Sequence, residues 1–251
     1  MASVRELSAP YANFMVGPRH GAGVCRRCFN LTDGYDQCYA CARQASVLDL
    51  VVPVSYSIAG EQLHHALASY KRLPETAGRR LKVQLAAVLW RFLATHERCI
   101  AKTLGIGTFP VVTTVPSGDE QRDELHPLRW MVGEAVGLTR GRHRRVLRRS
   151  ATHVAPRAFS PEKFRSAETL IGEPVLLIDD TWTTGANAQS AAAALKAAGA
   201  GPVAAVVIGR HVNRDWHQNS QRLRRLGGFD WSECSLCARA PTAIATPPVP
   251  A

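Results

Sequence analysis

The stretch between residues 174 and 208 constrains the fold of this chain most strongly. The segment PVLLIDD (174–180) is apolar up to its two acids and predicts a buried strand. The loop TWTTG follows, an alanine-rich stretch (186–198) predicts a helix, and PVAAVVI (202–208) predicts the next strand. A helix between two strands at this spacing is a βαβ unit, because parallel strands need a crossover connection. The sequence therefore predicts an α/β fold with a mainly parallel sheet flanked by helices.

Other segments fit the same architecture. Residues 48–58 predict a strand that is interrupted at Pro53, and residues 109–116 predict a short buried strand. Apolar residues at helical spacing predict an amphipathic helix over 78–97, and a further helix is expected at 127–138.

The chain has 251 residues, which corresponds to one or two domains at about 150 residues each. We divide it into a loose leader (1–20), a four-cysteine module (21–47), the α/β domain (48–230) and a tail (231–251) with a CxxC pair and a proline-rich end.

The two acids at the end of the 174–180 strand, and the loop behind them, combine the features of a phosphate site. Glycine permits a tight loop, threonine hydroxyls donate hydrogen bonds, and a helix N-terminus presents free N–H groups. An ionised aspartate only accepts hydrogen bonds, so Asp179 and Asp180 suit the two hydroxyls of a cis-diol. The pattern predicts a monophosphate cradle beside sugar hydroxyls, and a plain strand–turn–helix is the alternative.

The segment VLLIDDTWTTGAN (175–187) closely resembles the phosphoribosyl-pyrophosphate (PRPP) motif of type I phosphoribosyltransferases. The resemblance implies that Asp179 and Asp180 are the catalytic acids and lie at the ribose 2′- and 3′-hydroxyls. It implies a sheet of the type I phosphoribosyltransferase kind, with PRPP or a nucleoside 5′-monophosphate at the carboxyl ends of its strands and Mg²⁺ beside the pyrophosphate. The loop residues that would surround the 5′-phosphate are Thr181, Thr183, Thr184 and Gly185, and Trp182 is counted with this PRPP-binding loop at a variable position.

Six of the seven cysteines form three CxxC pairs, a pattern that in a reducing cytosol favours metal binding over disulfides. Two of these pairs lie close together near the N-terminus and supply four thiolates on two turns, as tetrahedral structural zinc requires. A redox pair or ordinary buried thiols are the alternatives. The four proposed ligands are Cys25, Cys28, Cys38 and Cys41.

A four-cysteine element ahead of a PRPP motif is similar to the ComF family of competence-associated, phosphoribosyltransferase-like proteins. Further similarity lies in the lysine-bearing stretch 69–71, in 171–174 and in 198–200. The resemblance implies a zinc-ribbon-like module joined to a phosphoribosyltransferase domain, with a role in DNA uptake during natural transformation.

Three functions follow from these resemblances. An active enzyme would transfer the phosphoribosyl group to a nitrogen acceptor and release pyrophosphate. The strand at 112–116 departs from the family pattern, however, and the acids after it would repel pyrophosphate unless Mg²⁺ intervenes. The alternatives are a non-catalytic DNA-binding protein of competence and a regulatory protein that senses PRPP or a nucleotide. The acids in question are Asp119, Glu120, Asp123 and Glu124.

The third CxxC pair, Cys234 and Cys237, cannot close a tetrahedral site alone. It could complete a second site with histidines, bind zinc across a dimer, or have no special role, and the last is the interpretation that we favour. Cys99, near the end of the 78–97 helix, is most simply an ordinary thiol.

A basic run at 140–149 contains six arginines and no acid. Arginine binds phosphate bidentately, so the run could contact a nucleic-acid backbone or pyrophosphate, or it could be a solvated loop. If the run contacts pyrophosphate, then Arg148, Arg149 or Arg157 would close over PRPP. The arginines of the run are Arg140, Arg142, Arg144, Arg145, Arg148 and Arg149.

Four histidines could each act as a general base, and their spacing singles none of them out. Ordinary core or surface histidines are the simpler interpretation. They are His64, His65, His126 and His153.

The charge balance favours partners that carry phosphate. There are 31 basic and 20 acidic residues, which leaves a net charge of +11. No apolar run reaches the about 20 residues of a membrane span, and the start of the chain lacks the apolar core of a secretory signal. We therefore expect a cytoplasmic protein.

Overall fold

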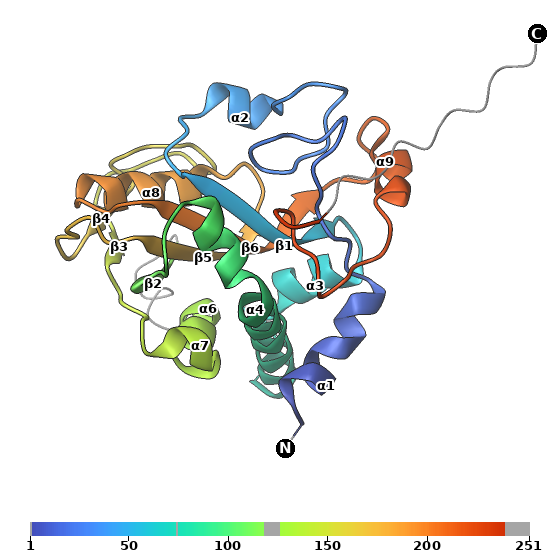
Figure 1. Cartoon of the computed structure of the whole chain (residues 1–251), viewed down its shortest axis with the longest axis horizontal. Coiled ribbons are helices and arrows are strands. Elements are labelled where there is room, and N and C mark those ends of the chain that lie inside the picture. The colour runs from blue at the N-terminus through green and yellow to red at the C-terminus, as the bar shows by residue number, and fades with distance from the viewer. Residues whose placement is uncertain (1, 74, 118–125, 239–251) are drawn as a thin grey trace, which may run out of the picture.

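The computed structural model describes residues 2–73, 75–117 and 126–238. At its centre lies a four-stranded sheet in the order β1-β6-β5-β2, and every neighbouring pair is parallel (Figure 1). The predicted α/β fold with a parallel sheet is confirmed. The strands are β1 (Leu50–Ile58), β6 (Val203–Val212), β5 (Val175–Trp182) and β2 (Val111–Thr114).

Helices cover both faces of the sheet (Figure 1). The residues of β5 alternate between two apolar clusters, as a strand buried on both faces requires. Leu176 and Ile178 pack into the cluster that contains α4 (Glu75–Thr103), whereas Val175 and Leu177 pack into the cluster that contains α8 (Ala186–Ala197).

The α4 face also carries α3 (Gln62–Ser69), and the α8 face carries the cysteine module with its helix α2 (Tyr39–Arg43). The short helix α9 (Asn219–Arg225) follows β6, and its Leu223 belongs to the same apolar cluster as Phe29 of the cysteine module.

Strand β1 does not break at Pro53, contrary to the prediction from sequence. Pairing with β6 continues on both sides of the proline, at Val52 and at Ser55. The strand lies at the edge of the sheet, where a missing backbone donor is tolerated better than in a central strand. The N-terminal segment covers this edge, because the carbonyl of Val16 accepts a 2.9 Å hydrogen bond from the N–H of Tyr56.

The prediction of a single helix over 127–138 is wrong. The chain forms α6 (Pro127–Trp130), a π-helical turn (Met131–Ala135) and α7 (Gly137–Arg140). Val136 between them is extended, with φ −85° and ψ 98°. Glycine at position 133, within the π-helical turn, weakens the helical preference of this stretch.

An antiparallel ribbon, which the sequence did not predict, follows α7. It pairs β3 (Leu147–Arg149), within the basic run, with β4 (Phe164–Ser166). The segment just before β3 runs beside the outer edge of β2, since Val112 exchanges backbone hydrogen bonds with Arg142 and Arg144. Both edges of the described sheet are therefore covered.

The first residues are packed rather than loose. They form α1 (Val4–Ser8), which Ser3 and Glu6 begin with a capping box, and a 3-10 helix (Ala9–Asn13). Tyr11 and Met15 are buried in the same core cluster as α4.

The acids Asp119, Glu120, Asp123 and Glu124 lie outside the described residues, as does the proline-rich end (239–251). Among the described helices, none combines the length and the apolar character that crossing a membrane requires.

Candidate functional site

The predicted phosphate loop lies at the carboxyl edge of the sheet, where parallel strands of open α/β folds bind ligands. Asp179 and Asp180 occupy the end of the interior strand β5, and α8 begins directly after the loop. Gly185 is the N-cap of α8 in the left-handed conformation (φ 82°) and offers no side chain to the first N–H groups of the helix. The Thr183 side chain is exposed and that of Thr184 is half-buried. The Thr184 hydroxyl accepts a 3.4 Å hydrogen bond from the N–H of Ala186, so the loop presents the Thr183 hydroxyl together with the N–H groups that follow Ala186 in the first turn of α8.

The buried ring of Trp182 packs against the backbone of this loop at Gly185. Its ring is 2% exposed, and a Cβ atom on Gly185 would lie 2.0 Å from it. Position 185 therefore requires glycine for two reasons, the positive φ and the contact with the indole. The sequence prediction put Trp182 among the ligand-binding residues, but a buried ring leaves it only its backbone for such a role.

Asp180 is held by two residues that follow α3. Its Oδ2 accepts a 2.6 Å hydrogen bond from the hydroxyl of Tyr70 and lies 2.5 Å from the Nζ of Lys71. Burial and the nearby carboxylate raise the pKa of the Tyr70 hydroxyl well above its usual value, so Tyr70 stays a donor. The stretch 69–71, noted for its family resemblance, thus reaches the motif carboxylates.

Asp179 differs from its neighbour in electrostatics. Burial and the adjacent Asp180 carboxylate raise its pKa to about 8, although the Lys71 cation opposes the shift. Its Oδ1 accepts a 2.9 Å hydrogen bond from the N–H of Asp180. At neutral pH the pair therefore holds a proton on Asp179 much of the time.

Positively charged and titratable groups gather around the motif loop. The hydroxyl of Thr184 donates to the carbonyl of Arg157, a residue with φ 61°. The rings of His64 and His211 lie 5.2 Å apart. Burial lowers the pKa of His211, and the nearby His64, Arg210 and Arg157 lower it further. Arg210 and Arg157 therefore place positive charge near His211, at the end of β6.

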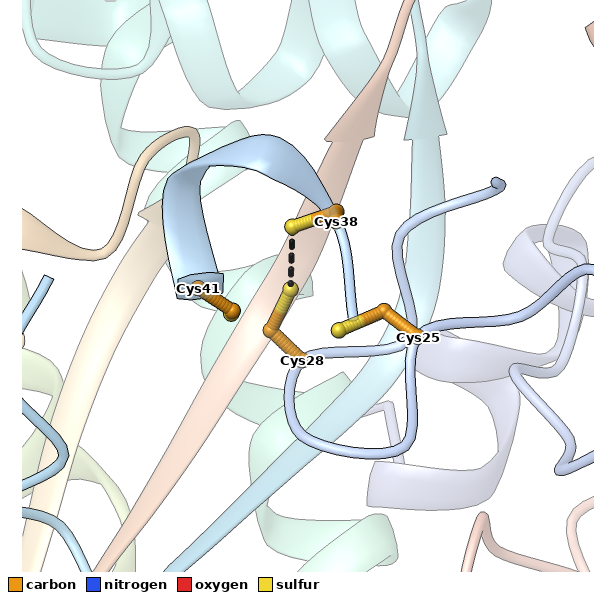
Figure 2. A group of neighbouring side chains, drawn as sticks. All are labelled: Cys25, Cys28, Cys38 and Cys41. Atoms are coloured by element: carbon orange, nitrogen blue, oxygen red, sulfur yellow. Dashed lines mark hydrogen bonds between the residues drawn. The ribbon is translucent and has the colours of Figure 1, made fainter. Parts of the chain in front are cut away.

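The four N-terminal cysteines meet in one buried group (Figure 2). Their sulfur atoms all lie within 4.8 Å of one another, and Cys28 Sγ and Cys38 Sγ are 3.6 Å apart. Cys25 and Cys28 come from one tight turn, in which Phe29 N–H donates to the Cys25 carbonyl, and Cys38 caps the helix α2. The prediction that these four residues form a group able to hold a metal ion is confirmed.

The surroundings of this cluster favour thiolates bound to a cation. The guanidinium of Arg210 donates to the Cys28 carbonyl at 2.9 Å, and its Nη2 lies 3.7 Å from the Cys28 sulfur. Without a cation, contacts with the neighbouring thiols and burial raise the pKa of Cys28 and Cys41 above the usual range. Four sulfurs this close cannot all ionise unless a metal neutralises them. Arg210 also donates to the carbonyl of Trp182 at 3.1 Å and so joins the cluster to the end of β5.

No protein-family model matches the chain, and a search of curated proteins finds no match either. The family resemblance therefore rests on the motifs themselves, and the function has to be argued from the arrangement of these residues.

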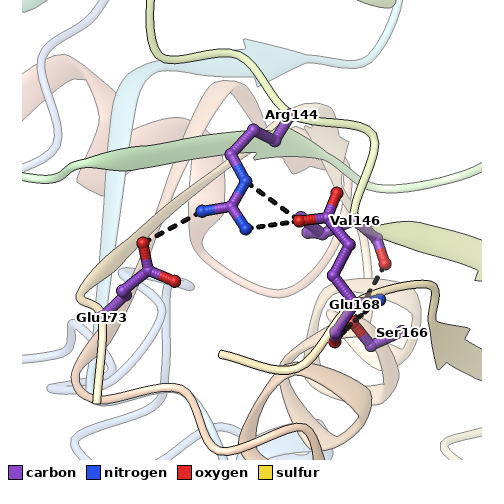
Figure 3. Close-up of polar contacts among 5 residues, drawn as sticks. All are labelled: Arg144, Val146, Ser166, Glu168 and Glu173. Atoms are coloured by element: carbon purple, nitrogen blue, oxygen red, sulfur yellow. Dashed lines mark hydrogen bonds and ion pairs between the residues drawn. The ribbon is translucent and has the colours of Figure 1, made fainter. Parts of the chain in front are cut away.

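Two arginines of the basic run form ion pairs inside the molecule. Arg142 Nη1 and Nη2 lie 2.5 and 2.9 Å from the carboxylate oxygens of Glu97 on α4. Arg144 lies between two carboxylates, with Nε 3.1 Å from Glu168 and Nη1 3.0 Å from Glu173 (Figure 3). The sequence could not reveal these contacts, because the partner acids lie far from the run in the chain.

The remaining arginines of the run include exposed ones. Arg140, Arg145 and Arg148 have exposed side chains, and Arg149 is half-buried in β3. Contacts with a phosphate backbone or pyrophosphate would then involve Arg140, Arg148 or Arg149 rather than Arg142 and Arg144.

The four candidate histidines have different positions. His64 lies beside His211 near the motif, and His65 contacts the Gly60 carbonyl at 3.1 Å. His126 caps α6 by accepting from the N–H of Leu128, and His153 is exposed. Arg210 and His211, which belong to the motif surroundings, were missed because they lie in what reads as an ordinary apolar strand and its end.

Proposed function

We propose that this chain binds the 5-phosphoribosyl group of PRPP, or of a nucleoside 5′-monophosphate, at the carboxyl edge of its sheet. The observation that carries the proposal is the position of Asp179 and Asp180. They lie near the end of the interior strand β5, and the threonine–glycine turn after the strand leads into α8. The arrangement supplies acceptors for two hydroxyls and donors for one phosphate within a few residues.

In this proposal the loop binds the 5′-phosphate and the two acids bind the ribose. The Thr183 hydroxyl and the N–H groups of the first turn of α8 surround the phosphate, and the Thr184 hydroxyl joins them by exchanging the Arg157 carbonyl for a phosphate oxygen. Lys71 and Tyr70 both contact Oδ2 of Asp180, so a ribose hydroxyl is accepted at Oδ1. The resemblance to the PRPP motif supports the same assignment.

The cations beside the motif suit a second phosphate group. Lys71 supplies positive charge for pyrophosphate, as does the exposed Arg157 side chain near His211, and Mg²⁺ bound with PRPP would neutralise the leaving group further. When a nitrogen acceptor is also bound, its lone pair forms a bond to C1′ while the bond from C1′ to pyrophosphate breaks. Without such an acceptor the same site senses PRPP or a nucleotide.

The cluster of Cys25, Cys28, Cys38 and Cys41 would hold a structural zinc ion in this proposal. Four protein sulfurs fill a tetrahedral shell and leave no position for substrate. The cluster lies in the same apolar group as Val51 of β1 and Val207 of β6, so the metal would fix the module to the sheet.

The nucleic-acid alternative receives less support. In the basic run at 140–149, Arg142 and Arg144 form ion pairs with Glu97, Glu168 and Glu173. These pairs lower the positive charge that the run can offer to DNA. A DNA affinity that falls steeply with salt and depends on Arg148 and Arg149 would favour it instead.

A calorimetric series of ligands tests the proposal. We expect PRPP with Mg²⁺ to bind most tightly, ribose 5-phosphate to bind more weakly and ribose alone to give no heat, since the phosphate supplies most of the affinity. Equal binding of PRPP and inorganic pyrophosphate would show that the ribose is not recognised and would overturn the assignment of the two acids.

A further inference from the structure

A second group of four side chains that could bind a metal ion lies in a different apolar cluster from the first. His96 and Cys99 come from α4, and Cys234 and Cys237 come from the segment after α9. The ligand atoms of these four residues all lie within 4.8 Å of one another. The group uses all three cysteines that the N-terminal cluster leaves over.

The distances within this group are those of a tetrahedral site. His96 Nδ1 lies 3.9 Å from Cys99 Sγ and 3.8 Å from Cys237 Sγ, and the sulfurs of Cys234 and Cys237 are 3.4 Å apart. With bonds of about 2.3 Å to sulfur and about 2.0 Å to nitrogen, tetrahedral zinc separates its ligands by roughly 3.5–3.8 Å. Little movement is needed to place an ion at the centre.

The orientation of His96 prepares one nitrogen for a metal. The side chain is buried, and its Nε2 lies 3.0 Å from the carbonyl oxygen of Trp231. A carbonyl only accepts hydrogen bonds, so Nε2 carries the proton and Nδ1 of the neutral ring keeps its lone pair. That lone pair faces the sulfurs, and a backbone carbonyl on the other nitrogen is the usual support for a metal-bound histidine.

The backbone around both ligand pairs is already folded for coordination. His96 and Cys99 are three residues apart in α4 and share one face of the helix. Cys234 and Cys237 form a tight turn, in which Cys237 N–H donates to the Cys234 carbonyl at 3.1 Å. The N–H of Cys234 also lies 3.2 Å from Cys237 Sγ, where it would stabilise a thiolate.

We propose that His96, Cys99, Cys234 and Cys237 bind a second structural zinc ion. Thiolates with one imidazole in a tetrahedral arrangement select zinc, and four protein ligands leave no open position for catalysis. The ion fastens the segment 226–238 to α4, beside the stacking of Arg91 on the Trp231 ring at 4.2 Å and the Arg19–Glu233 ion pair at 2.6 Å. This proposal does not depend on the phosphoribosyl proposal.

Metal content tests the site directly. We expect the full-length reduced protein to hold two zinc ions per chain, and Cys234→Ser and His96→Ala each to hold one. The control His153→Ala, which alters an exposed histidine, keeps both ions. Cys25→Ser loses a different ion and keeps the one at His96. The proposal would be overturned if the parent and Cys234→Ser both held one zinc ion. It would equally be overturned if both held two.

A second test, the alkylation of cysteines, uses the parent protein alone and so does not depend on the folding of a variant. The Cys237 side chain is exposed, so without a metal an alkylating reagent modifies it rapidly. We expect Cys99, Cys234 and Cys237 of the zinc-loaded parent to resist alkylation until a chelator is added, as followed for each cysteine by mass spectrometry. Alkylation of Cys237 at the same rate before and after chelation would contradict the site. Protection that only a reductant removes would indicate a Cys234–Cys237 disulfide and would also contradict it.

Discussion

The ammonium group of Lys71 lies 2.5 Å from Oδ2 of Asp180, although the two residues belong to segments more than a hundred positions apart in the chain. The Asp180 side chain is 8% exposed and Lys71 is 35% exposed, so the pair is open to solvent on one side only. Lys71 therefore balances the charge of two adjacent carboxylates at the end of β5, while its exposed side can meet an anionic ligand.

Replacing Lys71 should destabilise the protein more at high pH than at low pH. Without this cation, Asp179 becomes still harder to ionise and Asp180 loses its ion-pair partner. Ionisation of the two carboxyl groups therefore destabilises the folded state more than in the parent. We expect Lys71→Gln to lower the free energy of unfolding by about 1–2 kcal/mol near pH 8 and by less near pH 5, as measured by urea unfolding. The control Lys71→Arg keeps the charge and should lose less. An equal loss at both pH values would contradict this role.

The raised pKa of Asp179 predicts a pH dependence of stability. Its usual value of 3.8 rises to about 8, so between these values the folded state binds more protons than the unfolded state. The parent therefore loses stability from this group as pH rises through that window.

Asp179→Asn removes this titration. As pH rises from 5 to 8, the free energy of unfolding of this variant minus that of the parent should increase by about 1–3 kcal/mol. This figure is reduced for the partial exposure of the Asp179 side chain. Parallel stability profiles of the two proteins would mean that Asp179 ionises normally. Glu134→Gln, at an exposed acid in the π-helical turn outside the motif, serves as the control.

Gly185 should not tolerate a side chain. In Gly185→Ala the methyl group would have to displace the Trp182 ring, and alanine would have to adopt a φ of 82°. We expect a loss of about 2–4 kcal/mol and a red shift of tryptophan emission as the indole becomes exposed. Gly141→Ala is the matched control, since it has φ −73° and open space around its Cβ position. Equal stability of the two variants would show that the loop is not under this constraint.

The arginines of the basic run should divide into two classes. Arg142→Ala removes the double contact with Glu97 and a 2.9 Å hydrogen bond to the Phe109 carbonyl, and should cost about 1–2 kcal/mol. Arg148→Ala, at an exposed position, should change stability by less than about 0.5 kcal/mol. Thermal unfolding distinguishes them. Similar small effects for both variants would indicate that the Arg142 pair contributes nothing.

The sequence predicts those parts of the structure that local patterns determine. Apolar runs separated by a helix identify β5 and β6 as parallel neighbours, and closely spaced CxxC pairs identify the N-terminal cluster. In both cases the residues that have to meet are close together in the chain, so spacing alone carries the information.

What the sequence could not predict depends on contacts between distant segments. Cys234 and Cys237 look like a pair without a role, because their partners His96 and Cys99 lie in an apparently ordinary amphipathic helix. Arg144 likewise reads as a free phosphate ligand until the fold brings Glu168 beside it. Such pairings follow from the topology rather than from any local pattern.

Calorimetric titration of PRPP with Mg²⁺ tests the central claim most directly, with the parent, Glu134→Gln and the double variant Asp179→Asn/Asp180→Asn compared under the same conditions. We expect saturable binding in the first two proteins and a dissociation constant at least about tenfold higher in the double variant, which loses two acceptors for the ribose hydroxyls. Equal affinity in all three proteins, or no binding by the parent at millimolar PRPP, would contradict the claim that the carboxyl edge of this sheet binds the phosphoribosyl group.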